Sequence, residues 1–133
     1  MTPDMTPNPL ASAAALRNAA TYLELFGWFP LDYFYLCPDR FPSADVVGAI
    51  SVAVYGRAVY DPFDDLNPFM DPKDLAVFTA TAEYFDQYLR SQHGYDHGAP
   101  LWNEQPERTL SEVTTTLRNA ADDLEASHDR QNS

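Results

Sequence analysis

The chain has 133 residues, 45% hydrophobic and 14% aromatic, which favours one domain with a hydrophobic core and excludes disorder of the whole chain. Its net charge of −12 argues against direct binding of nucleic acid or of an anionic membrane surface and permits a basic protein partner. With no long apolar run, no signal-peptide pattern and one cysteine, Cys37, we expect a cytoplasmic protein without internal disulfides. Negative charge also keeps an aromatic-rich protein in solution, so both interpretations of the charge stay open.

The first predicted helix follows a short polar arm. Residues 1–8 are polar and include two prolines, so we expect a flexible N-terminal arm. Asn8 is a good N-cap and Pro9 suits the first helical turn. Apolar residues recur at helical spacing over residues 10–26, and Gly27 can end the helix in a left-handed cap.

The next segment, residues 27–43, is rich in aromatic residues. Pro30, Pro38 and Pro42 exclude a continuous helix here. The rings either fold inward as a lid over the core or form a contact surface, where tyrosine and tryptophan are favoured. The sequence leaves open whether this aromatic segment is core or interface.

A second helix is predicted from an N-cap at Ser43 to about Tyr55, with Asp45 in its first turn. Gly48 lies inside it. An interior glycine costs about 1 kcal/mol relative to alanine, and we expect the close approach of another helix to be the reason for it. The connection at residues 57–71, rich in aspartate and proline, is expected to be a loop with at most a short turn of its own.

Two further helices have clear start signals. Asp71 caps a third helix that should stop near Gln92. Thr109 and Glu112 form a capping box for a fourth helix that should end near Ser127. Residues 128–133 are expected to be a flexible tail. The apolar stripe of the third helix consists of Leu75, Phe78, Ala82, Phe85 and Leu89.

These elements predict a mainly α fold, a compact single-domain bundle of about four helices over residues 9–127 with long irregular connections. Two stretches, LRNAATYLE at residues 16–24 and LRNAADDLE at residues 117–125, agree at seven of nine positions. Their shared alanine pairs predict that the first and last helices pack closely and bring the termini together. Convergent helix composition is the alternative explanation.

The stretch LWNEQPERTLSEV at residues 101–113 holds the candidate binding residues. Asn103 and Glu104 can bind polar groups of a ligand beside the Trp102 ring, with Arg108 as an anion partner. Alternatively, Trp102 plugs the core, Asn103 stabilises the turn and Arg108 pairs with a nearby glutamate. The complete set of candidate ligand- or partner-binding residues is Trp28, Trp102, Asn103, Glu104, Arg108 and His97.

Other clusters favour structural roles. The H-x-x-D-H cluster at residues 93–97 holds three metal-competent side chains, but glycines at 94 and 98 break the helix that would align the histidines. The aspartates within residues 61–71 lack the order of a calcium-binding loop. Because no nucleophile motif and no phosphate-binding loop is present, we predict no catalytic residue, no metal and no cofactor.

Part of the chain resembles a known family. Its residues Trp102-Asn103-Glu104, Pro106, Arg108-Thr109 and Glu112-Val113 are similar to a WND-x-P-x-RT-x-x-EV signature. That signature belongs to small proteins of actinobacteria and their phages that are grouped as a domain of unknown function. The stretches LRNAATYLELFGW and DVVGAISVAVYG also look similar to it. Asp45 stands where the pattern has cysteine, so a cysteine hydrolase is not expected, and the resemblance implies no activity.

Two functional hypotheses follow. The leading one is a small acidic, non-enzymatic protein-interaction or accessory domain, phage- or mobile-element-encoded, whose protein partner offers a basic surface. The alternative is a small-molecule-binding or hydrolytic domain with a pocket around Trp102. Self-association into a homo-oligomer through an exposed aromatic patch is a third possibility.

Overall fold

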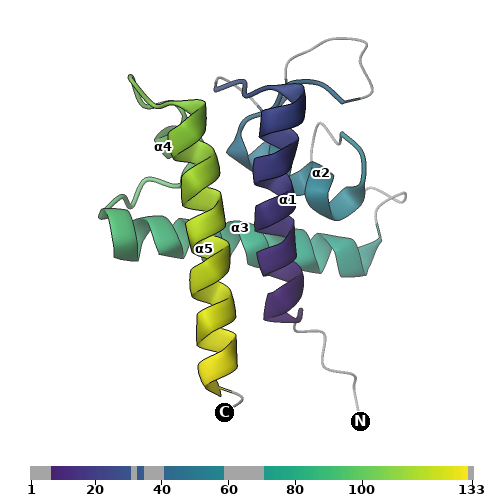
Figure 1. The fold of residues 1–133 in the computed structure, drawn as a ribbon. Helices are drawn as coiled ribbons and strands as arrows, with labels where there is room; N and C mark the ends of the chain where they lie inside the picture. The colour runs from purple at the N-terminus through teal and green to yellow at the C-terminus, as the bar shows by residue number, and fades with distance from the viewer. Residues whose placement is uncertain (1–6, 31–32, 35–40, 59–70, 132–133) are drawn as a thin grey trace.

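A computed structural model describes residues 7–30, 33–34, 41–58 and 71–131 (Figure 1). Within these residues the chain is mainly helical, as predicted, and contains no strand. The helices are α1 (Pro9–Phe26), α2 (Val46–Tyr55), α3 (Pro72–His93), α4 (Ala99–Asn103) and α5 (Leu110–Gln131). The short helix α4 is the element that the sequence did not predict. None of the described helices has the length and apolar character needed to cross a bilayer.

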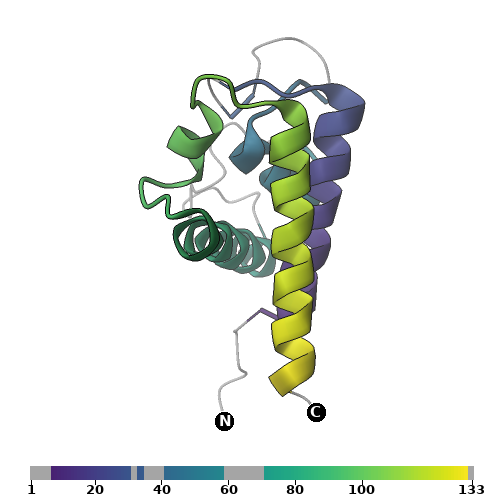
Figure 2. The same ribbon diagram turned by 60° about the vertical axis from the view of Figure 1, so that its left-hand side comes forward.

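The helices form two layers. Figure 1 shows α1 and α5 side by side and antiparallel, with α3 crossing behind them. In Figure 2 α3 is seen end-on while α1 and α5 remain upright, so α3 lies crosswise to the pair. α2 packs against both α1 and α3, and α4 packs against α2 and α3. The core therefore lies where the α1–α5 layer meets the other three helices.

The predicted pairing of the first and last helices is confirmed. α1 and α5 share the largest interface between any two helices of the described chain. The alanine pairs of the two echoed stretches are fully buried, which lets the two backbones approach closely: Ala19, Ala20, Ala120 and Ala121. The start of α1 and the end of α5 lie at the same end of the molecule (Figure 1).

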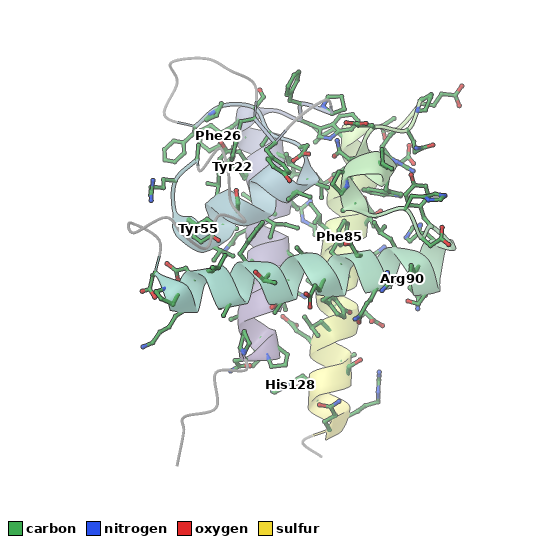
Figure 3. All side chains as sticks on the ribbon, turned by 180° about the vertical axis from the view of Figure 1, so that it is seen from behind. Tyr22, Phe26, Tyr55, Phe85, Arg90 and His128 are labelled. Carbon is green, nitrogen blue, oxygen red and sulfur yellow. The ribbon has the colours of Figure 1, made fainter. Side chains whose placement is uncertain are left out.

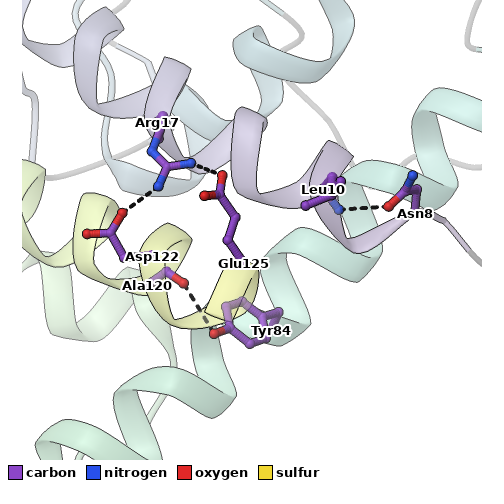
Figure 4. A network of polar contacts seen from close by, with 7 residues as sticks. All are labelled: Asn8, Leu10, Arg17, Tyr84, Ala120, Asp122 and Glu125. Carbon is purple, nitrogen blue, oxygen red and sulfur yellow. Dashed lines mark hydrogen bonds and ion pairs between the residues drawn. The ribbon is translucent and has the colours of Figure 1, made fainter. Parts of the chain in front are cut away.

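Ion pairs join the two helices at two places along their length. The Arg17 guanidinium of α1 pairs with Asp122 and Glu125 of α5 (Figure 4). The hydrogen bonds that Arg17 donates to Glu125 and Asp122 raise the pKa of the guanidinium. Further along, Arg118 of α5 pairs with Glu24 of α1, with 3.0 Å between Nη1 and Oε2. Each helix thus supplies one arginine to the other.

The helix ends follow local chemistry in most places. Asn8 and Asp71 cap α1 and α3 by accepting hydrogen bonds from backbone N–H groups two residues later. α3 ends at His93, and Gly94 follows it in the left-handed conformation with φ 64°. α5 continues to Gln131, so the predicted end of this helix near Ser127 is wrong, while the flexibility of residues 128–133 stays a prediction.

The predicted cap of α2 is also wrong by two residues. Asp45, not Ser43, is the N-cap, and its carboxylate accepts from the Gly48 N–H at 2.7 Å. The Ser43 hydroxyl instead donates to the Phe26 carbonyl at 2.9 Å. The reason is that Ala44 is held in an extended pairing, in which it donates to the Gly27 carbonyl and accepts from Phe29. The chain can turn into a helix only after that pairing.

Gly48 does mark a close approach, but not of a helix. A β-carbon at this position would lie 2.1 Å from the Tyr33 carbonyl oxygen. Tyr33 belongs to the aromatic segment, and its carbonyl also accepts from the Asp45 N–H at 3.0 Å. The glycine therefore lets the start of α2 press against this segment, and the expectation of a neighbouring helix was wrong.

The described part of the aromatic segment mostly faces the core. Phe34 is 2% exposed, and Trp28, Tyr33 and Phe41 are half-buried against the core. Figure 3, seen from the α3 side, shows Tyr22 and Phe26 of α1 lying close together. Their ring centroids are 4.9 Å apart, and Phe26 remains 42% exposed. The lid interpretation therefore holds for Phe34 and agrees with the half-buried positions of Trp28, Tyr33 and Phe41.

α3 buries a slightly different stripe from the predicted one. Phe78, Phe85 and Leu89 are fully buried, whereas Leu75 and Ala82 are only half-buried. Thr81 takes an inward position, where its hydroxyl lies 2.8 Å from the Ser12 hydroxyl of α1. The turn and aspartate cluster expected before Asp71, and the terminal residues 1–6 and 132–133, lie outside the described residues.

Candidate functional site

The short helix α4 carries Trp102 and Asn103 and is held in place by contacts with residues of other elements. Its N-terminal Ala99 N–H donates to the Asp86 carboxylate of α3 at 2.8 Å. Pro100 fits the first turn, and Gly98 precedes it at φ 91°. A five-residue helix has little stability of its own, so tertiary contacts must hold it.

Trp102 is a core residue. It is 2% exposed, and the Phe85 ring of α3 meets it edge-on with a centroid distance of 5.9 Å. His93, at the end of α3, lies at 6.4 Å on another side. The Arg108 guanidinium covers the indole, with Cζ 4.3 Å from the ring centroid. The indole is therefore enclosed by two rings and one cation.

Asn103 joins three segments that are far apart in sequence. It is completely buried, and its Oδ1 accepts from the Trp28 Nε1 at 2.8 Å and from the Val46 N–H at 3.1 Å. Its Nδ2 donates to the Pro30 carbonyl at 3.1 Å. The same carboxamide thus fixes the indole of Trp28 and satisfies the first N–H of α2. Figure 1 shows the elements it joins gathered at one end of the molecule.

The turn into α5 is held by the residues after α4. One half of the predicted capping box is present, because the Glu112 N–H donates to the Thr109 hydroxyl at 3.1 Å. The Glu112 carboxylate accepts from the Thr109 hydroxyl at 3.3 Å, where the box would have it accept from the Thr109 backbone N–H. Arg108 donates from Nε to the Trp102 carbonyl and from Nη1 to Glu112, both at 3.1 Å. Arg108 therefore ties the end of α4 to the first turn of α5.

A surface hollow lies beside this turn. It has a volume of about 380 Å³ and is named here the α4–α5 hollow. It is lined by Tyr95, Gln105, Pro106, Glu107, Arg108 and Glu112. Gln105 donates from Nε2 to the Tyr95 hydroxyl at 3.1 Å and to the Leu101 carbonyl at 2.9 Å, which fixes one wall. Two carboxylates and one guanidinium give the lining a net negative charge.

Glu107 reaches this hollow through an unusual backbone. Its φ of 70° makes it the one described residue other than glycine with a positive φ. A glutamate in this region is strained relative to glycine. Glu107 belongs to the lining of the hollow, and the turn that contains it is closed by the Arg108 N–H, which donates to the Gln105 carbonyl.

The structure brings some of the six predicted site residues together and separates the others. Trp28, Trp102, Asn103 and Arg108 form one connected cluster, and of the six only Arg108 lines the α4–α5 hollow. Glu104 is exposed at the end of α4. The set therefore falls into one cluster, in which Trp102 and Asn103 are buried and Trp28 and Arg108 half-buried, and into separate exposed residues.

The sixth predicted residue lies apart from the cluster. His97 is exposed, 3.6 Å from the Asp96 carboxylate and with its ring 5.5 Å from that of Tyr95. His93 instead packs at Trp102, so the two histidines face different surroundings. In the described ranges no group of three or more metal-ligating side chains comes together.

Comparison with known proteins places the chain in a family. The profile of a family of unknown function matches residues 7–123, which include both echoed stretches almost completely and the whole α4–α5 turn. The chain belongs to DUF6197. No curated protein and no solved structure matches it. The expected family of unknown function is confirmed, while its actinobacterial or phage setting and its signature stay predictions.

Several residues that shape this site in the DUF6197 chain were not identified from the sequence. Asp86, which holds the start of α4, and Tyr95, Gln105 and Glu107, which line the hollow, carry no motif. The sequence Pro-Glu-Arg after Gln105 did signal a turn, but the positive φ at Glu107 depends on contacts made by its neighbours. The hollow could be found only from the three-dimensional arrangement.

Proposed function

We propose that this protein is a non-enzymatic interaction domain that binds a basic surface of a partner protein through the α4–α5 hollow. The observation that carries the proposal is the hollow itself, a surface depression with two glutamates, Glu107 and Glu112, in its lining. Glu104 is exposed nearby at the end of α4. Leu101, whose carbonyl holds the Gln105 wall, is 50% exposed and offers an apolar contact at the rim.

The chemistry of the hollow suits a cationic side chain. A lysine or arginine of a partner would meet the Glu107 carboxylate, the Glu112 carboxylate that already pairs with Arg108, and the Tyr95 ring, which can interact with a cation. The one cation of the lining, Arg108, is already engaged by Glu112 and by the Trp102 carbonyl. The overall charge of −12 adds long-range attraction for a basic partner.

The arrangement of Trp28, Trp102 and Asn103 favours a binding site at the hollow over a binding pocket around Trp102. Trp28, Trp102 and Asn103 use their polar atoms in contacts that hold the fold, as described above. The described lining of the hollow offers no serine, cysteine or histidine as a nucleophile. We therefore propose an accessory role in which the domain recognises another protein, while a phage or mobile-element setting is proposed from the sequence resemblance alone.

Titration with a defined peptide tests this proposal. A fluorescent peptide rich in lysine and arginine should bind the wild-type protein, with affinity falling steeply as salt rises. Because any polycation is attracted by the net charge, the decisive comparison is between two variants that each lose two charges. One carries Glu107→Gln in the lining of the hollow with Glu104→Gln at the end of α4, and the other carries Asp74→Asn with Glu83→Gln on α3.

The hollow variant should lose about tenfold in affinity, equivalent to about 1.4 kcal/mol, while the α3 variant should lose no more than about twofold. Equal losses in the two variants would mean that only net charge is sensed and would contradict the proposal. Unchanged thermal stability of both proteins serves as the control for folding.

The volume of the hollow also suits a second candidate, a small polar ligand. About 380 Å³ lies within the range of small-molecule sites, about 300–1,000 Å³. Under this alternative, ligand addition would shift the NMR signals of Tyr95 and of the Arg108 Nε–H, with no peptide required. Screening a set of small zwitterions and organic cations by this readout distinguishes the two candidates.

A further inference from the structure

We propose that α5 can be exchanged between two copies of this chain, giving a dimer in which α5 of each copy packs on α1 of the other. The inference rests on the α1–α5 seam, defined by the echoed stretches at residues 16–24 and 117–125, and on the connection that attaches α5. It does not depend on a partner binding in the α4–α5 hollow.

The seam is reciprocal. Arg17 stands at the second position of its stretch and pairs with Glu125, the last residue of the other stretch. Arg118 stands at the second position of its own stretch and pairs with Glu24, again the last residue of the other. The LRNAA-x-x-LE pattern is therefore complementary to itself when two helices run antiparallel.

The centre of the seam supports the same arrangement. Leu16, Ala19 and Ala20 of α1 are fully buried, and so are the matching residues of α5, namely Leu117, Ala120 and Ala121. Small residues let the helix axes approach, and the leucines fill the space beside them. Recognition is thus contained within the two helices.

α5 depends on few other elements. It packs mainly against α1 and touches α3 at only a few positions. Its main contact with α3 is through Tyr84, whose hydroxyl donates to Asp123 at 2.8 Å and lies 3.2 Å from the Ala120 carbonyl. An α5 supplied by a second copy would make all of these contacts at the same position on α1 and α3.

A single short connection determines which copy supplies α5. It comprises residues 104–109, between the end of α4 and the start of α5. Within it, Glu107 holds the strained φ of 70°, which opening of the connection would release. Against this, Arg108 stabilises the closed turn by its bonds to Trp102 and Glu112. Short connections under strain favour exchange of an element between copies.

Charge exchange within the seam tests the proposal directly. The first variant carries Arg17→Glu with Glu24→Arg, and the second carries Arg118→Glu with Glu125→Arg. Both also carry Asp122→Asn, so that no third carboxylate opposes the new pairs. Alone, each variant sets like charges against each other across its seam. Exchange of α5 between the two variants restores opposite charges in both seams of a mixed dimer.

The two variants are unfolded, mixed in equal amounts and refolded at several concentrations. Labelling one of them with ¹⁵N lets native mass spectrometry separate mixed dimers from dimers of one kind. We expect mixed dimers to exceed either single-kind dimer at least tenfold. Monomers alone, or the random ratio of one mixed pair to half as many of each single kind, would overturn the proposal.

A second pair of variants keeps the test decisive if the charge-exchanged chains fold poorly. Pro106→Ala with Glu107→Ala makes the connection helix-forming, so α5 extends away from its own α1. Glu107→Gly instead removes the strain of the closed turn. The first should dimerise at least tenfold more tightly than wild type, and the second more weakly, in sedimentation over a range of concentrations. Equal behaviour of the two would contradict exchange through this connection.

Discussion

Replacing Asn103 by alanine should destabilise the whole fold, because this one carboxamide joins three segments. The change removes the acceptor of the Trp28 indole N–H and of the Val46 amide, together with the donor to the Pro30 carbonyl. Asn103 is fully buried, and so is Val46. No residue next to position 103 can replace three bonds that point to different parts of the chain.

The size of the effect follows from the burial of each partner. The Val46 N–H would be left unsatisfied at a fully buried position, which costs about 1–3 kcal/mol. Trp28 and Pro30 are half-buried and can turn to water, so each lost bond there costs about 1 kcal/mol. The total is about 3–5 kcal/mol, a large part of the 5–15 kcal/mol typical of a small domain.

Guanidinium denaturation followed by circular dichroism measures this loss, with tryptophan fluorescence as a second probe of the two indoles. Asn18→Ala is the matched control, since Asn18 lies exposed on α1, and its substitution should change stability by less than 0.5 kcal/mol in either direction, about the limit for a surface change. A loss of less than about 1 kcal/mol in the Asn103→Ala protein would refute the structural role assigned to the carboxamide.

Three further substitutions test other contacts. Gly48→Ala should lower the free energy of unfolding by about 1–3 kcal/mol in thermal denaturation, because the new β-carbon would lie 2.1 Å from a backbone carbonyl oxygen; unchanged stability would contradict this. Burial and the bond to Asp123 raise the pKa of Tyr84. The stability that Tyr84 contributes is therefore complete below about pH 10 and is lost as the pH rises above it. In urea denaturation from pH 8 to 11.5, the Tyr84→Phe protein should lose less stability at alkaline pH than wild type. Pairing with Arg118 lowers the pKa of Glu24 below its ordinary value of 4.5. The stability that Glu24 contributes is therefore present above pH 4.5 and is lost as the pH falls below it. Glu24→Gln should flatten the acid side of the curve of stability against pH, and an unchanged curve would count against the pair.

The features that could be predicted from sequence are those carried by neighbouring residues. The caps at Asn8 and Asp71 and the capping box at Thr109 each depend on contacts spanning two or three residues. The helix pairing of α1 with α5 was predicted because the echoed stretches share buried alanines. The reciprocal ion pairs follow from the same echo once the two helices are known to run antiparallel.

The features that could not be predicted depend on contacts between distant residues. The partners of Asn103 lie 57, 73 and 75 positions away in the chain, and no local pattern indicates such bonds. The choice of Asp45 over Ser43 as a cap depends on how Ala44 pairs with the aromatic segment. α4 is too short to show a periodic pattern and is held by Asp86 of another helix.

The candidate site likewise contains some residues that the sequence indicated and others that only the three-dimensional structure reveals. The sequence pointed to the stretch at residues 101–113 and offered a binding role and a structural role for each residue. The buried positions of Trp102 and Asn103 agree with the structural role. The α4–α5 hollow uses neighbouring residues, such as Glu107, whose importance depends on backbone conformation and not on residue type.

Hydrogen exchange at the Trp28 indole and the Val46 amide, measured by NMR, tests most directly the claim that Asn103 holds these segments together. In the wild-type protein both hydrogens should exchange only as fast as global unfolding allows, with equal protection. In Asn103→Ala both should lose protection, and the half-buried Trp28 indole hydrogen should lose more than the fully buried Val46 amide. A Trp28 indole hydrogen that exchanges freely in the wild type, while the Val46 amide stays protected, would contradict the account.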